Sequence, residues 1–83
     1  MIEYNFTKHA DRQPQKLPLD VQRRIIAKIK HYIAAGNPLH FADHIEGERG
    51  KVYRFRIGSY RVIFDWDDHH ILVTKIALRS EAH

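Results

Sequence analysis

Arginines cluster in the stretch YRFRIGSYRVIFDW, which runs from Tyr53 to Trp66. Its alternation predicts two strands joined at Gly58–Ser59, a pair suited to a two-residue hairpin turn with glycine first. Such a turn places Arg56 opposite Arg61, with Arg54 on the same side. Like charges directly opposite on neighbouring strands destabilise a sheet by about 0.2–1 kcal/mol. We therefore interpret the arginines as a site for an anion, in preference to a merely solvated basic surface.

The other side of this hairpin is apolar, and we expect it to face the core. The same turn aligns three apolar or aromatic pairs: Ile57 with Tyr60, Phe55 with Val62, and Tyr53 with Phe64. Alternation then sends Val52, Ile63 and Asp65 to the face that carries the arginines.

The final stretch, ILVTKIALR, decides which further side chains join that face. An even-length loop after Trp66 would turn Lys75 toward the core, where an unpaired ammonium is costly. We therefore expect a loop of odd length, which sends Leu72, Thr74, Ile76 and Leu78 inward. The predicted basic face comprises Arg54, Arg56, Arg61, Lys75 and Arg79, with Arg49 and Lys51 at its entrance.

Arginine side chains can clamp a phosphate and stabilise a charged transition state, but they do not act as bases near neutral pH. RNA supplies its own nucleophile, the 2′-hydroxyl, so its cleavage needs a proton carrier besides these cations. His83, four residues after Arg79, is our first candidate because histidine transfers protons near pH 7. A frayed C-terminal residue is the competing interpretation. Glu46 and Glu48 are alternative bases, or residues of an ordinary solvated turn.

The remaining histidines do not form a convincing metal site. His40 and His44 lie four residues apart, and His69–His70 follow two aspartates in what reads as a hairpin tip. The chain has no cysteine, which excludes disulfides, cysteine-based zinc sites and thiol catalysis. We expect neither a metal nor another cofactor.

Composition describes a small basic protein. The chain has 83 residues, a formal net charge of +4 and 43% hydrophobic residues, which predicts a single domain over residues 1–83. A basic surplus favours polyanionic or acidic partners. The first residues lack the apolar segment of a secretory signal, and no apolar run approaches the length of a membrane span. We expect a cytoplasmic location and no membrane partner.

The periodicity predicts an α+β fold with four strands and two helices in the order β-α-α-β-β-β. A mainly antiparallel sheet carries both helices on one face, and an irregular connection spans Leu39–Lys51. The expected elements are a strand at Ile2–Phe6, a short helix from Thr7 that ends by Pro14, and strands at Val52–Ile57, Tyr60–Trp66 and Ile71–Leu78. KLPLD opens the main amphipathic helix, whose apolar positions recur at helical spacing from Val21 to Ile33.

The hairpin and the stretch ILVTKIALRSEAH resemble the C-terminal half of toxins of the RelE/ParE superfamily from type II toxin–antitoxin systems. The stretches KLPLDVQRRIIAKI and HIEGERGKVYRFR are similar to the family's main helix and to its approach to the hairpin. The resemblance implies a compact fold similar to that of microbial ribonucleases. For the RelE branch it also implies metal-independent mRNA cleavage in the ribosomal A site.

Carried over by position, the resemblance implies that Arg54, Arg56, Arg61 and Arg79 bind the RNA backbone and stabilise the scissile phosphate. Two positions depart from the family pattern. Leu78 stands where histidine is usual before the final arginine, and His83 stands where a tyrosine is common.

The favoured hypothesis is a ribosome-dependent mRNA endoribonuclease toxin whose partners are a cognate antitoxin, the ribosome and mRNA. In it Arg61 and Arg79 stabilise the transition state, Arg54 and Arg56 orient the backbone, and His83 transfers a proton. Lys51, Arg49 and Lys75 would add to RNA binding. Two alternatives stay open: a ParE-like inhibitor of DNA gyrase without nuclease activity, and a degenerate toxin that retains only its binding functions.

Overall fold

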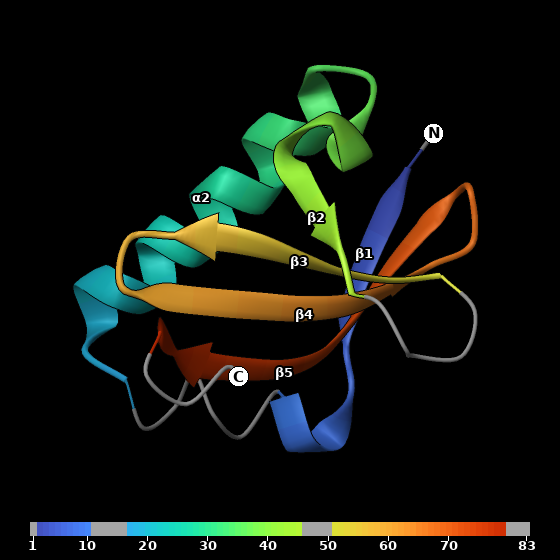
Figure 1. The fold of residues 1–83 in the computed structure, drawn as a ribbon. Helices are drawn as coiled ribbons and strands as arrows, with labels where there is room; N and C mark the ends of the chain where they lie inside the picture. Colours follow the sequence, from blue (N-terminus) through green and yellow to red (C-terminus); the bar gives the residue numbers. More distant parts are fainter. Residues whose placement is uncertain (1, 11–16, 46–50, 80–83) are drawn as a thin grey trace.

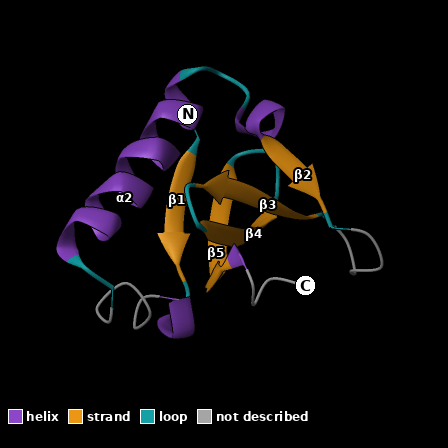
Figure 2. Cartoon of the chain, turned by 60° about the vertical axis from the view of Figure 1, so that its left-hand side comes forward, coloured by secondary structure: helices purple, strands orange, loops and turns teal. Residues whose placement is uncertain are grey.

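The protein forms one five-stranded mixed sheet with a long helix across one face (Figures 1 and 2). The computed structural model describes residues 2–10, 17–45 and 51–79. The strand order is β1-β5-β4-β3-β2, in which β1 runs parallel to β5 and the other neighbours are antiparallel. The elements are β1 (Glu3–Phe6), a helical turn at 8–10, α2 (Leu19–Ala34), the 3-10 helix η1 (Pro38–Phe41), β2 (Ala42–His44), β3 (Val52–Ile57), β4 (Tyr60–Trp66) and β5 (His70–Leu78).

The α+β class is confirmed, but the prediction of four strands is wrong. The additional strand, β2, lies within the segment predicted to be an irregular connection, and it pairs with β3 at the edge of the sheet. Its three residues are too few to show an alternating pattern, and η1 directly precedes it. No helix within the described ranges is both long and apolar enough to span a bilayer.

Helix α2 packs on the sheet through the stripe that its periodicity predicts. Ile25, Ile29 and Tyr32 are buried at helical spacing, and Gly36 follows the helix with a φ of 96°, a conformation that favours glycine. The Tyr32 ring lies against Phe55, with 4.8 Å between ring centroids. Burial raises the pKa of Tyr32, so its phenol is a neutral part of the core.

The β3–β4 hairpin has the predicted register, including Arg56 opposite Arg61. Gly58 has a φ of +58° and Ser59 does not share the positive sign, which fits a turn that needs glycine only at its first central position. Phe55 and Phe64 are fully buried, and their stacked rings have centroids 4.4 Å apart. The apolar side of the hairpin therefore forms the core against α2.

Strand β5 changes phase within its length, so the prediction of a uniform odd-loop register is wrong. Trp66 pairs with Ile71, and Phe64 with Val73, because an even number of residues (67–70) separates the first pair. At a bulge, Thr74 is skipped in the register, and the pairing resumes with Ile63 opposite Lys75. The Thr74 hydroxyl donates to the Ile63 carbonyl oxygen at 3.3 Å.

The bulge reverses which side chains face the core. Ile71 and Val73 are buried before it and Ile76 after it, whereas Leu72 is only half-buried and Leu78 is exposed. Of the residues predicted to point inward, Ile76 does so. Lys75 reaches the arginine side as expected, because the inserted residue turns the ammonium away from the core.

We predict that Phe55→Ala lowers the free energy of unfolding by about 3–5 kcal/mol, because it removes a fully buried ring from the centre of the core. Urea denaturation followed by circular dichroism measures the change. Leu19→Ala is the control: Leu19 is 59% exposed, so its truncation should cost less than about 1 kcal/mol. Equal losses in the two variants would contradict the described core.

Candidate functional site: a basic sheet face

The side of the sheet opposite α2 carries a group of cations that we call the basic face: Arg54, Arg56, Arg61 and Lys75, with Arg79 just beyond β5. Two rows cross it. Arg54, Ile63 and Lys75 form one, and Arg56, Arg61 and Ala77 form the other. Neighbouring strands lie about 4.8 Å apart, so each row gathers its residues within about 10 Å.

The hairpin turn holds Arg61 and brings Arg79 close to it. Nη1 of Arg61 donates to the carbonyl oxygens of Gly58 at 3.0 Å and Tyr60 at 2.9 Å. The backbone N–H of Arg79 donates to the Ser59 carbonyl oxygen at 2.8 Å. Arg61 and Arg79, which we predict to stabilise the transition state, are therefore both hydrogen-bonded to this turn.

Helix α2 adds a cation at this turn that the sequence analysis missed. A β-carbon placed on Gly58 would lie 3.1 Å from Nη1 of Arg24. Arg24 reads as an ordinary solvated position of an amphipathic helix, and the pattern contains no signal that it reaches the hairpin. The turn thus has an arginine from the helix beside it in addition to Arg61 and Arg79.

An acidic residue also enters the basic face, and the sequence analysis missed it too. Asp43 on β2 lies opposite Arg54, and its Oδ2 is 2.8 Å from Nε of Arg56 and 3.8 Å from Nη2 of Arg54. The Asp43 side chain is 47% exposed and that of Arg56 is 62% exposed. Exposed ion pairs of this kind contribute about 0.2–1 kcal/mol and weaken with salt. Asp43 offsets part of the repulsion between Arg56 and Arg61.

The Arg54 side chain is only 28% exposed, less than half the exposed fraction of Arg56. Its Nε is buried and has no hydrogen-bond partner among the described residues. A buried donor without a partner costs about 1–3 kcal/mol. The strands therefore hold the inner part of the Arg54 guanidinium in an enclosed, unpaired position below the exposed Arg56.

The other predicted site residues lie apart from the turn or outside the described ranges. The Lys51 ammonium is 3.2 Å from the Asp68 carboxylate, beside the β4–β5 connection. Five residues of extended chain, or about 17 Å, separate Lys51 from Arg56. Arg49, His83, Glu46 and Glu48 belong to segments that the structure does not describe.

Several of the described histidines contact aromatic or amide groups. His40 lies edge-on to Phe41, His44 packs on the Tyr53 ring, and His70 is 2.6 Å from the Asn5 amide oxygen. Within residues 2–10, 17–45 and 51–79, no three histidines or acids come together as metal ligands.

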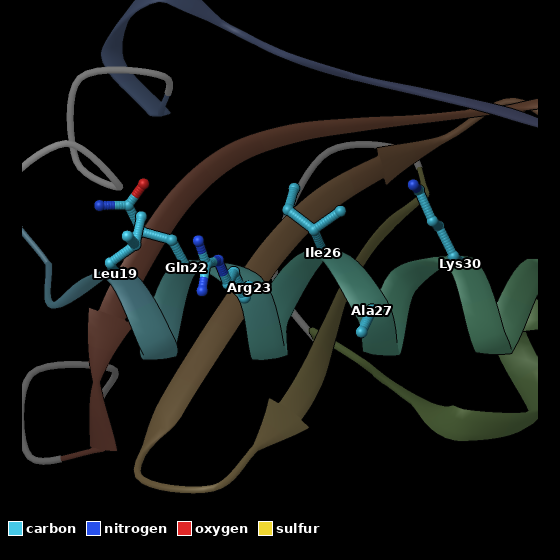
Figure 3. A pocket seen from close by; sticks show the side chains of 6 residues that line it. All are labelled: Leu19, Gln22, Arg23, Ile26, Ala27 and Lys30. Atoms are coloured by element: carbon cyan, nitrogen blue, oxygen red, sulfur yellow. The ribbon is translucent and has the colours of Figure 1, made fainter.

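A separate hollow of about 390 Å³ lies along the exposed side of α2 (Figure 3). Leu19, Ile26 and Ala27 give it an aliphatic surface, and Arg23 and Lys30 add positive charge. Gln22 is its remaining described lining residue. The lining contains no histidine or acid, the side-chain types that most often transfer protons near neutral pH, so the hollow does not supply the chemistry that the basic face lacks.

The comparisons with known proteins rest on structure. No protein-family model and no curated protein matches the sequence. A chain of the toxin–antitoxin complex RelBE2 from Mycobacterium tuberculosis is similar with a TM-score of 0.77 and 21% identity, over 94% of this chain and 98% of that one.

Two archaeal structures are similar over most of both chains. A chain of the RelE–RelB complex from Pyrococcus horikoshii has a TM-score of 0.72 and 28% identity, with 98% of each chain covered. A chain of the RelB–RelE antitoxin–toxin complex from Methanococcus jannaschii has a TM-score of 0.69 and 22% identity, with 90% of each covered. The mixed sheet, the helix across it and these similarities show that the chain has a RelE-like toxin fold.

Proposed function

We propose that this protein is the toxin of a type II toxin–antitoxin module and a ribosome-dependent mRNA endoribonuclease. The observation that carries the proposal is the opposition of Arg56 and Arg61 on a RelE-like fold, with Arg54 and Lys75 in the adjoining row. A phosphodiester as the ligand is supported by the paired N–H donors of arginine, which bind phosphate oxygens. Fold alone does not determine function, so the proposal depends on this site.

The proposed reaction is an in-line displacement at phosphorus. The 2′-oxygen attacks the neighbouring phosphate, a new P–O bond closes a 2′,3′-cyclic phosphate, and the bond to the 5′-oxygen breaks. The proton of the 2′-hydroxyl passes to a base, and the departing 5′-oxygen receives a proton. Arg61 and Arg79 would stabilise the charge that builds on the phosphate oxygens, because guanidinium donors bind such oxygens in a fixed geometry.

Arg54 and Arg56 would orient the RNA backbone, and Lys75 would extend the contact along β5. Lys51 and Arg49 would meet RNA farther from the reacting phosphate. His83 would carry a proton in the displacement, with Glu46 or Glu48 as alternative bases. No step of this reaction needs a metal ion.

The proposed partner is a cognate antitoxin, since the similar structures are toxin–antitoxin complexes. We propose that it covers the basic face or displaces the C-terminal segment, either of which would block the entry of RNA. A basic toxin surface favours an acidic segment of the antitoxin.

We predict that Arg61→Ala and Arg79→Ala each lower the rate of mRNA cleavage on purified ribosomes by about 10²–10³-fold, the usual cost of losing one donor to a charged transition state. Mapping of mRNA 5′ ends measures the rate. Arg23→Ala removes the same charge from the exposed side of α2 and should leave cleavage within about twofold.

Two outcomes would overturn this assignment. Inhibition of DNA supercoiling by gyrase, with no cleavage on ribosomes, would identify a ParE-like activity. If induction of the protein without its antitoxin leaves growth and mRNA ends unchanged, the chain is a degenerate toxin.

We predict that His83→Ala lowers the cleavage rate by about 10²–10⁴-fold while RNA binding persists, because a proton carrier acts in the transition state. His69→Ala, at the exposed β4–β5 connection, is the matched control and should cleave like the wild type. Equal cleavage by His83→Ala and His69→Ala would exclude His83 as the proton carrier and direct attention to Glu46 and Glu48.

A further inference from the structure

Asp43 places a negative charge on the basic face, although the substrate proposed to bind there is itself a polyanion. Its carboxylate lies 2.8 Å from Nε of Arg56, on the side of the sheet that would meet RNA. Charge alone would disfavour an acid at this position, since it repels phosphate. Its presence therefore needs a reason other than affinity for RNA.

Stability supplies only a small part of that reason, about 0.2–1 kcal/mol for an exposed ion pair. Both side chains of the ion pair are about half exposed or more, and water and salt weaken such pairs. Arg54, the nearer neighbour along the strand register, receives only the longer contact of 3.8 Å. The short contact goes to Arg56, across a diagonal of the β2–β3 pair.

The contact lies at the inner nitrogen of the Arg56 guanidinium. No hydrogen bond or ion pair within the described part of the chain occupies the two terminal nitrogens of Arg56. Those nitrogens carry the parallel N–H groups with which arginine binds two oxygens of one phosphate. A carboxylate on Nε limits rotation of the long side chain and leaves this pair of donors open.

We propose that Asp43 is a positioning residue: it orients Arg56 so that the terminal guanidinium nitrogens meet the phosphate of the RNA. This inference rests on the proposed ribonuclease function and adds a residue to it. A held guanidinium keeps its alignment as charge develops on the phosphate, so its benefit appears in kcat. The contact with Asp43 directs the Arg56 guanidinium toward β2, on the side of β3 away from Arg61 on β4.

The test compares Asp43→Asn with Asp65→Asn. Both remove one negative charge, and Asp65 lies exposed on the same face of the sheet without an ion pair among the described residues. We expect Asp43→Asn to lower kcat for cleavage of ribosome-bound mRNA about tenfold while KM stays equal or falls. Asp65→Asn should leave kcat within about twofold, with a similar small change in KM.

A double-mutant cycle tests whether the effect passes through Arg56. In an Arg56→Ala background, Asp43→Asn should change kcat by less than about twofold, because the group that it positions is absent. A tenfold loss of kcat that persists in the Arg56→Ala background would overturn the inference. So would a second result, in which the single variant Asp43→Asn loses an ionisation from the pH profile of kcat. The second result would make Asp43 a base.

The outcomes separate this inference from the function on which it rests. If the wild type cleaves and the two asparagine variants behave alike, Asp43 acts only through its charge and the inference is wrong. A rise of kcat in Asp43→Asn would make the ion pair inhibitory, which also overturns it. If the wild type does not cleave RNA on ribosomes, the proposed function fails, and the inference fails with it.

Discussion

The turn at Gly58–Ser59 fixes the register on which the basic face depends. A hairpin with this two-residue turn places Arg56 opposite Arg61 and Phe55 opposite Val62 at once. A shift by one residue would expose the core side chains and bury the arginines. The burial of Phe55 against α2 therefore holds two like charges together on the other side. Core packing compensates for their repulsion.

The surroundings of these arginines moderate the repulsion without removing it. Asp43 brings one carboxylate to Arg56, and the turn carbonyl oxygens bind Arg61. Each device occupies only part of a guanidinium, while Arg54 keeps a buried Nε without a partner among the described residues. The result is a set of cations that are held in place yet retain donors for a ligand.

Alternation and turn chemistry were sufficient to predict the hairpin, the helix stripe and the arginine side of the sheet. They were insufficient for β2, since three residues show no period, and for Asp43, whose importance depends on that strand. The phase change in β5 was also hidden, because ILVTKIAL offers apolar residues in both phases. Only pairing with Phe64 and Ile63 shows that Thr74 is the inserted residue. Arg24 was missed because it lies far from Gly58 in the sequence, and only the packing of α2 on the sheet brings the two together.

The parallel pairing of β1 with β5 joins the first strand of the chain to the last. Glu3 pairs with His70, and β1 has no other strand beside it in the described sheet. During synthesis, β1 can pair only after β5 has been made, and β5 also supplies Lys75, with Arg79 just beyond it. An incomplete nascent chain thus lacks both its closing strand and part of its basic face.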